Sequence, residues 1–309
     1  MSTRAGYVRP RGLRAGDRVA VIAASGPPNQ ERLDRGVRAL LDLGLRPDVL
    51  GSARAAGEYL AGDDDLRAAD LTTALTDPAY AAVLCACGGY GAQRTLELVD
   101  WEKIGTPSPR VLVGYSDVTS LLEAVAVKLG WASLFGPMVA GRDFHQGQYG
   151  FDTLARLLTD PEPVRELVFP GARTLVPGVA EGMTLGGTAS MLTSSLGSDT
   201  SLPARGGILF LEDVDEEPYR LDRILTQLRR SGYLDGVAGI LCGTWTGCGE
   251  PEQVERLLRD RLGGLGVPVL TGADIGHGVP MQTFPVGVRA RLDATAGVLR
   301  FLEPVLSAS

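Results

Sequence analysis

The sequence predicts an α/β protein with a parallel sheet in its N-terminal part. Short apolar runs typical of buried strands alternate with segments in which apolar residues recur at the spacing of one helix face. Glycine-rich turns follow two of these strands, at 26–28 and 88–91. Strands that alternate with helices run parallel, and ligands gather at the carboxyl ends of such strands. We therefore expect helices on both faces of the sheet and a functional site at the edge where the glycine turns lie.

The expected N-terminal elements follow this alternation. Strands are predicted at 18–25, 48–50, 80–86 and 111–113, helices at 30–43, 63–77, 92–98 and from 118 onward, then a short strand and turn at 131–139 and a helix at 151–158. Three aspartates at 63–65 favour a helix start, because the helix dipole stabilises negative charge there. Pro78 is expected to end that helix.

A change of character after residue 160 divides the chain. The Pro-rich stretch 160–163 and the loose sequence after it predict a linker at 161–178, between an N-terminal α/β domain at 1–160 and a smaller, β-rich α/β domain at 179–309. The segment 182–196 is glycine-rich and then helical. Further strands are predicted at 207–211, 237–242, 267–272, 286–292 and 298–302, and helices at 219–229 and 252–262. A length of 309 residues also favours two domains.

Composition excludes several classes of protein. Hydrophobic residues make up 44% of the chain and charged residues 22%, as in a globular protein. A net charge of −7 without any Lys/Arg run argues against a nucleic-acid binder. The sequence shows neither a signal peptide nor an apolar run of about 18 residues, so we expect a cytoplasmic protein that does not bind membranes. The four cysteines do not have the spacing of a zinc site. Cys85 lies in an apolar run, which predicts a small, buried hydrophobic residue.

The stretch VLVGYSDVTSLL, at 111–122, predicts a strand, a sharp turn and a helix, with Ser116 at the apex. A serine there lies beside the N–H groups that open the helix, which suits a nucleophile whose attack creates an oxyanion. Only the first half of a G-x-S-x-G signature is present, because Val118 replaces the second glycine. The alternative is that Ser116 caps the helix, with Asp117 adding favourable charge.

The glycine turn at 88–91 has two interpretations. It could hold a phosphate, although it lacks the spacing of known nucleotide-binding loops. Alternatively, its glycines let the backbone approach the reacting centre and direct an N–H group toward it.

A nucleophilic hydroxyl needs a base, which is usually a histidine oriented by a carboxylate. Of the two histidines, His145 lies in a polar loop, whereas His277 lies between glycines directly after a predicted strand. Glu212 ends another apolar strand, and a carboxylate there is costly unless it is paired. The acidic residues that follow Glu212 allow a metal site, but no histidine is near, and Glu217 before Pro218 is typical of a helix start.

Seven stretches of the sequence, in the same order, resemble the LD-carboxypeptidase family of serine peptidases. They are GDRVAVIAASGP, GGYGAQRTL, VGYSDVTSLL, FGPMV, GMTLGGTASML, ILFLEDVDEEPYRLDRILTQL and GADIGHGVPMQTFPVGVRARLD. The resemblance implies Ser116 as nucleophile, Glu212 as carboxylate and His277 as base. It also implies an oxyanion hole made by the backbone N–H groups of Asp117 and Gly89. A Rossmann-like N-terminal domain, a homodimer and the absence of a metal cofactor are further implications.

The chain departs from the family pattern at three positions. Cys87 stands where arginine often precedes the two glycines, Phe135 where histidine often precedes Gly-Pro-Met, and Thr188 where asparagine often follows the two glycines. The first and third lie near the expected cleft, where they would bear on substrate preference.

The activity that the resemblance implies is release of the terminal D-alanine from a murein tetrapeptide during peptidoglycan recycling. The carbonyl that is attacked belongs to an L-centre, on meso-diaminopimelate or lysine. The terminal carboxylate needs a cation, for which Arg94, Arg142 and Arg220 are the candidates. One alternative is a microcin-immunity peptidase of the same family, which cleaves peptidyl-nucleotide antibiotics. Another is a muropeptide-binding protein without turnover.

Overall fold

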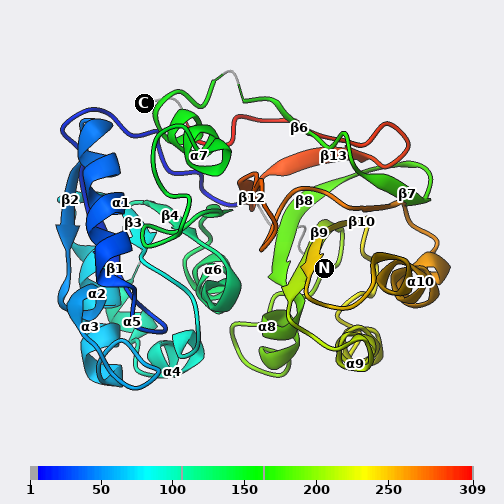
Figure 1. The fold of residues 1–309 in the computed structure, drawn as a ribbon, viewed down its shortest axis with the longest axis horizontal. Helices are drawn as coiled ribbons and strands as arrows, with labels where there is room; N and C mark the ends of the chain where they lie inside the picture. The colour runs from blue at the N-terminus through cyan, green and yellow to red at the C-terminus, as the bar shows by residue number, and fades with distance from the viewer. Residues whose placement is uncertain (1–5, 106, 163, 308–309) are drawn as a thin grey trace.

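A computed structural model describes residues 6–105, 107–162 and 164–307, which form two β-sheets with helices packed against them (Figure 1). The first sheet has six strands and the second has eight. Helix α6 (Thr119–Lys128) contacts strands of both sheets, so it lies where the two meet (Figure 1). The predicted α/β class, with a parallel N-terminal sheet and a second sheet domain, is confirmed.

The six-stranded sheet has the order β12-β5-β4-β3-β1-β2. Its strands are β1 (Arg18–Ile22), β2 (Arg46–Val49), β3 (Tyr80–Cys85), β4 (Val111–Gly114), β5 (Ser133–Phe135) and β12 (Phe284–Val286). Strands β1 to β5 run parallel, and β12 joins β5 antiparallel. The carboxyl ends of β3 and β4 are neighbours, which brings the glycine turn after β3 beside the turn after β4.

The helices of this first part are α1 (Gln30–Asp42), α2 (Gly51–Arg54), α3 (Asp64–Thr76), α4 (Ala92–Glu97), α5 (Trp101–Ile104), the 3-10 turn η1 (Ser116–Val118), α6 and α7 (Tyr149–Thr159). Asp63 caps α3 by accepting the N–H of Leu66 at 2.8 Å, which explains why the aspartate run starts that helix. The short helices α2 and α5 were not predicted, because four residues do not establish a helical period.

The eight-stranded sheet has the order β6-β14-β13-β8-β9-β10-β11-β7. Its strands are β6 (Glu166–Val168), β7 (Arg173–Val176), β8 (Val179–Thr188), β9 (Gly207–Val214), β10 (Gly239–Thr246), β11 (Val269–Thr271), β13 (Arg289–Asp293) and β14 (Val298–Phe301). Strands β8 to β11 run parallel and the flanking strands antiparallel. The helices α8 (Ala189–Ser194), α9 (Pro218–Arg230) and α10 (Pro251–Leu262) lie together on one side of this sheet (Figure 1), and the 3-10 turn η2 (Gly263–Leu265) follows α10.

The segment 161–178, which we expected to be a linker, instead contributes strands β6 and β7 to the second sheet. Each strand buries one leucine, Leu167 or Leu175, while most of its other residues stay partly or fully exposed. Strands of three and four residues between prolines carry too little alternation to be recognised from sequence. Strand β8 was also missed, because its glycine-rich second half lacks the apolar pattern of a strand. Strand β12 was missed as well, and it returns a C-terminal segment to the first sheet.

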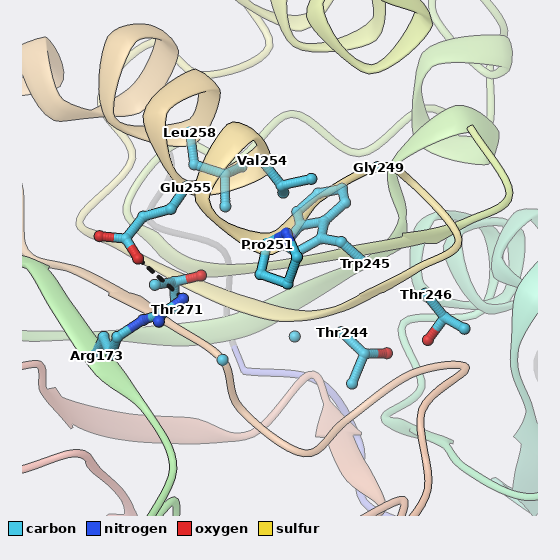
Figure 2. A pocket seen from close by; sticks show the side chains of 12 residues that line it. Arg173, Thr244, Trp245, Thr246, Gly249, Pro251, Val254, Glu255, Leu258 and Thr271 are labelled. Atoms are coloured by element: carbon cyan, nitrogen blue, oxygen red, sulfur yellow. Dashed lines mark ion pairs between the residues drawn. The ribbon is translucent and has the colours of Figure 1, made fainter. Parts of the chain in front are cut away.

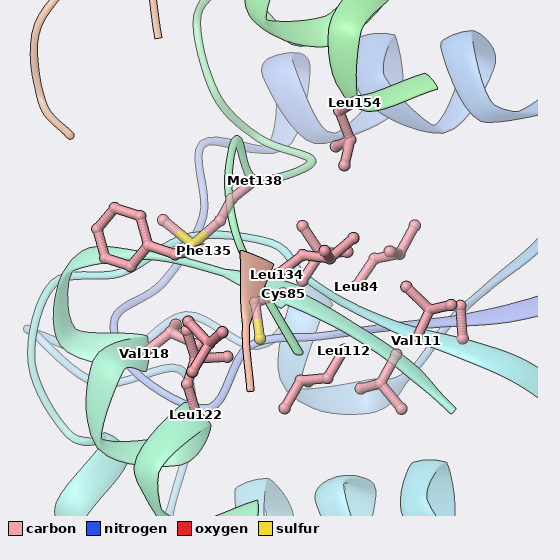
Figure 3. Packing of buried hydrophobic residues seen from close by; sticks show 14 of the residues in the cluster. Leu84, Cys85, Val111, Leu112, Val118, Leu122, Leu134, Phe135, Met138 and Leu154 are labelled. Atoms are coloured by element: carbon pink, nitrogen blue, oxygen red, sulfur yellow. The ribbon is translucent and has the colours of Figure 1, made fainter. Parts of the chain in front are cut away.

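The core of the first sheet lies beneath the turn that contains Ser116. Figure 3 shows Cys85, Leu112, Val118, Leu122 and Phe135 converging from β3, β4, β5 and the helical segment after β4. None of these five side chains is more than 1% exposed. Burying a large apolar side chain contributes about 1.5–3 kcal/mol, so this packing fixes the base of the turn. Cys85 is the buried small hydrophobe that was predicted.

Across the helices of the described residues, none combines the length and the apolar character needed to cross a membrane.

Candidate active site

Ser116 lies at the apex of the predicted strand–turn–helix, in an uncommon backbone conformation. Its φ is +63°, in the left-handed region, where a non-glycine residue costs about 1–3 kcal/mol and persists only when its surroundings hold it. Gly114 is one such surrounding feature, because a methyl group on it would lie 2.5 Å from Val118 Cγ1. The Ser116 side chain makes no capping hydrogen bond to η1 or α6 within the described residues, so the helix-cap interpretation is not supported.

The glycine turn after β3 packs against Ser116. A methyl group placed on Gly88 would lie 3.0 Å from Ser116 Cβ, 3.2 Å from Ser116 Oγ and 3.5 Å from the backbone nitrogen of Asp117. Gly89 has a φ of +109°. In the described part of the chain, the N–H groups of Asp117 and Gly89 donate to no acceptor, which leaves both available to a ligand. The interpretation of this turn as a close backbone approach agrees with the geometry.

The side chain of Asp117 fixes the two turns relative to each other. Its Oδ2 accepts the N–H of Ala92 at 2.8 Å, at the start of α4, directly after the glycine turn. The buried Arg67 donates from Nη1 to the carbonyl of Gly91 at 2.9 Å. Burial raises the pKa of Asp117 above its ordinary value, while the Ala92 N–H and the charge of Arg67 oppose that shift.

Glu212 and His277 form a hydrogen-bonded pair within the second part of the chain. Glu212, near the end of β9, is fully buried, and its Oε2 lies 2.7 Å from His277 Nδ1. The same oxygen accepts the backbone N–H of His277 at 3.1 Å. An ionised carboxylate can only accept, so Nδ1 carries the proton and Nε2 of the neutral imidazole is left as an acceptor. The second oxygen, Oε1, accepts the hydroxyl of Thr188 at 2.5 Å.

Glycines permit the close approach between His277 and Glu212. A methyl group on Gly276 would lie 2.4 Å from Glu212 Oε2, so no larger residue fits there without displacing the carboxylate. On the other side of the imidazole, the N–H of Gly278 donates to Thr244 Oγ1 at 3.0 Å. The loop that holds His277 is therefore anchored to both β9 and β10.

An aromatic contact joins the two halves of the site. The ring of Tyr115 lies 4.9 Å from the imidazole of His277, centroid to centroid, and Tyr115 directly precedes Ser116. Within the described residues no hydrogen bond links the Ser116 hydroxyl to His277. Such bonds are often long in ligand-free sites and shorten when substrate binds. The structure thus brings the Ser116 turn and the Glu212–His277 pair to the same place.

The three arginines predicted to bind the substrate carboxylate make no hydrogen bond or ion pair to the candidate site residues within the described part of the chain. Arg94 forms an ion pair with Asp64, with Nη2 and Oδ2 2.6 Å apart. Arg142 is exposed, and so is Arg220, which donates to the hydroxyl of Tyr219 at 3.2 Å. Throughout the described residues, none of these arginines is hydrogen-bonded or ion-paired to Ser116, Glu212 or His277.

His145 also remains apart from the pair. It lies in the loop before α7, and its Nδ1 is 3.2 Å from the carbonyl oxygen of the neighbouring Gln146.

The acidic residues after Glu212 have separate partners. Asp213 accepts the backbone N–H of Ser190 at 2.8 Å and its hydroxyl at 3.1 Å, and burial raises the pKa of Asp213 to about 6. Glu217 and Pro218 begin helix α9, as predicted. The described ranges contain no group of three or more His, Cys, Asp and Glu side chains that could hold a metal ion.

A pocket of about 300 Å³ lies beside β10 and α10 (Figure 2). Trp245 and Thr244 line it, and an ion pair between Arg173 and Glu255, 2.9 Å long, borders it. It does not contain Ser116, Glu212 or His277. Its relation to the site is indirect, through Thr244 and the N–H of Gly278.

Comparison with known proteins identifies the family. The LD-carboxypeptidase N-terminal domain matches residues 19–136, and the LD-carboxypeptidase C-terminal domain matches residues 181–292. SCO6489 of Streptomyces coelicolor, which carries a provisional carboxypeptidase name, is 50% identical, and the match covers 97% of each chain. The murein tetrapeptide carboxypeptidase of Pseudomonas aeruginosa is 32% identical over 89% of this chain and 93% of its own.

A solved structure extends the comparison to the fold. The microcin C7 self-immunity protein MccF superposes with a TM-score of 0.88, over 97% of this chain and 100% of its own. At 23% identity, this likeness shows a shared fold. Both family domains are matched, in order, on the chain whose two sheets are described above. The chain belongs to the LD-carboxypeptidase family.

Proposed function

We propose that this member of a carboxypeptidase family is a serine-type LD-carboxypeptidase that releases the terminal D-alanine from murein tetrapeptide in peptidoglycan recycling. The observation that carries the proposal is the hydrogen bond between the buried Glu212 and His277, whose imidazole contacts the residue next to Ser116. A base oriented by a carboxylate beside a serine on a strained turn is the arrangement that nucleophilic catalysis requires.

In the proposed first step, Ser116 Oγ attacks the carbonyl carbon of the L-centre residue that precedes D-alanine. His277 Nε2 takes the hydroxyl proton, and Glu212 holds Nδ1–H and stabilises the imidazolium. The oxyanion that forms accepts hydrogen bonds from the backbone N–H groups of Asp117 and Gly89. When the C–N bond breaks, His277 returns its proton to the leaving amine of D-alanine, and an acyl-enzyme remains.

In the proposed second step, water replaces D-alanine. His277 takes a proton from the water, the hydroxide attacks the ester carbonyl, and the same two N–H groups hold the second oxyanion. Breaking the ester bond returns the proton to Ser116 Oγ and releases the tripeptide. The chemistry thus needs only side chains and backbone groups of this chain.

Arg94, Arg142 and Arg220 remain our candidates for the terminal carboxylate, and Asp64 already neutralises Arg94. We also propose domains at 1–160 and 179–309, from the change of sequence character after residue 160, and a cytoplasmic location. A homodimer is a further proposal, which the family resemblance implies.

A second candidate function is cleavage of a peptidyl-nucleotide antibiotic, which the sequence similarity to the microcin C7 self-immunity protein of Escherichia coli, 25% identical over 96% of each chain, favours. Its test is the same as that of the first candidate. The protein is incubated separately with murein tetrapeptides that contain diaminopimelate or lysine and with a peptidyl-nucleotide, and the products are weighed by mass spectrometry. Loss of D-alanine from a tetrapeptide supports the proposal, whereas cleavage of the nucleotide conjugate alone supports the immunity function. Binding of tetrapeptide without any product would indicate a non-catalytic muropeptide-binding protein.

A further inference from the structure

The hydroxyl of Thr188 holds the carboxylate oxygen that His277 does not use. Thr188 ends β8, is 3% exposed and lies opposite Glu212 in the parallel register with β9. Its Oγ1 is 2.5 Å from Glu212 Oε1. A carboxylate has no proton to give when ionised, so the hydroxyl is the donor, and this length is typical of a charge-assisted O–H···O⁻ bond. The two oxygens of Glu212 are thus held by different side chains, Oε1 by Thr188 and Oε2 by His277.

The backbone of Thr188 makes a second contact, with the helix that follows Ser116. Its N–H donates to Thr119 Oγ1 at 3.2 Å, and Thr119 is the first residue of α6. This approach requires glycine at the preceding position, because a methyl group on Gly187 would lie 2.6 Å from Thr119 Cγ2. A continuous chain of hydrogen bonds therefore runs from Thr119 through Thr188 and Glu212 to His277.

We propose that Thr188 is a positioning residue for the reaction, acting through Glu212 on His277. Its hydroxyl fixes the carboxylate so that Oε2 faces Nδ1, and its N–H holds this assembly against the helix that carries the Ser116 turn. The inference rests on the proposed function, in which Glu212 and His277 form the catalytic base. Thr188, which stands where the family pattern often has asparagine, thereby acquires a role in the reaction.

The other ionisable groups that act on Glu212 do not depend on Thr188. Tyr115, Asp213 and Cys248 interact electrostatically with the Glu212 carboxylate. Asp213 is bonded to Ser190, and Tyr115 contacts His277 through its ring. Removing the Thr188 hydroxyl therefore changes one donor to Glu212 and leaves these charges in place.

The chain contains two histidines, so NMR can follow the imidazole of His277 directly. The C–H signals of the two imidazoles are titrated with pH, and His145→Gln assigns them. We expect Thr188→Val to move the titration midpoint of His277 to higher pH by about 0.5 unit or more, because a carboxylate that has lost a donor binds the imidazolium more tightly. Thr188→Ser keeps the hydroxyl and should retain the wild-type midpoint. If Thr188→Val does not fold, the same titration is carried out on Thr188→Ala, which removes side-chain atoms and adds none.

Thr184→Val is the matched control in the same strand. Its buried hydroxyl donates to the carbonyl of Val288 at 3.0 Å, so the variant loses a buried hydrogen bond and stability without touching Glu212. Its His277 midpoint should equal that of the wild type. A midpoint in Thr188→Val and Thr188→Ala that is unchanged from wild type would overturn the proposal.

A kinetic measurement complements the titration. With tetrapeptide as substrate, Thr188→Val should lower kcat by about tenfold or more with little change in KM, and Thr188→Ser should restore most of it. Since the NMR titration needs no substrate, it tests the role of Thr188 even if the wild-type protein fails to cleave tetrapeptide. Failure of the proposed function would appear in the wild-type assay, and failure of this inference in the titration.

Discussion

The ring of Tyr115 lies 4.9 Å from the imidazole of His277, and this contact joins two sites that are 162 positions apart in the chain (277 − 115). Tyr115 belongs to the turn after β4 of the first sheet, and His277 to the loop after β11 of the second. The candidate site therefore depends on how the two sheets pack, in which α6 takes part.

Replacing Ser116 with alanine should abolish turnover and preserve the fold. The hydroxyl makes no capping bond in the described residues, so its loss removes the nucleophile and little packing. We expect kcat/KM to fall by more than about 10³-fold with an unchanged melting temperature. His145→Ala is the control and should be close to wild type. Retention of more than about a tenth of the wild-type kcat/KM, a loss below ~1.4 kcal/mol in transition-state stabilisation, would remove Ser116 from the mechanism.

Gly88→Ala should impair catalysis more than stability. The added methyl group would lie 3.2 Å from Ser116 Oγ and 3.5 Å from the Asp117 nitrogen, in the space where an oxyanion would bind. We expect kcat/KM to fall by about tenfold or more. Gly264→Ala is a matched control, because nothing lies within 4 Å of a methyl group there. Equal kcat/KM values for Gly88→Ala and Gly264→Ala would show that the oxyanion does not bind in the space beside Gly88.

Glu123 should make the protein less stable as pH rises. Burial raises the pKa of Glu123 from the ordinary 4.5 to about 8, and the N–H of Leu202, at 3.2 Å, only partly opposes the shift. Between about 4.5 and 8 the native state holds a proton that the unfolded chain has lost, so the free energy of unfolding decreases with pH across that window. Glu123→Gln should flatten this dependence and stabilise the protein at pH 8, on the order of a few kcal/mol at most.

Urea unfolding at pH 5 and pH 8 measures this effect. Glu58→Gln changes an exposed glutamate and serves as the control. A pH dependence that is the same in Glu123→Gln and in the wild type would contradict the assignment to Glu123.

Cys87 should resist thiol reagents despite its place before the glycine turn. Its thiol donates to the carbonyl of Gly26, 3.0 Å away, and burial raises its pKa to about 12, so very little thiolate exists at neutral pH. Iodoacetamide at pH 7.5 should leave both the mass of the native protein and its activity unchanged. Rapid loss of activity in the wild type, absent in Cys87→Ser, would show that this thiol is accessible and reactive.

Chelators should not affect activity. Both oxygens of Glu212 are bonded, to Thr188 and His277, and the carboxylate of Asp213 is bonded to Ser190, so these oxygens are already committed to protein donors. The rate after dialysis against EDTA should match the rate before it. Activity that is lost on dialysis and returns with added metal would reassign these carboxylates as ligands and remove Ser116 as the nucleophile.

Local patterns predicted a large part of the architecture. The turn at Ser116 follows from an apolar run, a Gly-Tyr-Ser-Asp break and a helical period, all within 15 residues, from Val111 to Val125. The Asp63 cap of α3 and the Pro218 start of α9 are likewise local signals, and both are present in the structure. The pairing of Glu212 with an imidazole could be expected because a buried, unpaired carboxylate is costly.

The errors in the prediction fall on elements that depend on distant partners. Strands β6 and β7 lie where a linker was expected, and β8 lies where only a glycine-rich segment was recognised. Strand β12 pairs with β5 across 148 residues of chain (284 − 135, less one). Short strands acquire their stability from the sheet edge that they join, so their own residues carry little signal. The sequence also could not show that Arg94 forms an ion pair with Asp64.

The sequence by itself therefore determined the fold class and the residue types at several strand ends, because these depend on local periodicity, turns and the cost of burying charge. It also pointed to the family, through seven ordered stretches that resemble it. Only the tertiary structure decided which strand ends meet. The register of β8 with β9 places Thr188 opposite Glu212, and glycine at 187 and 276 admits Thr119 and the carboxylate at short range. Register and close approach are properties of two segments packed together, which neither segment specifies alone.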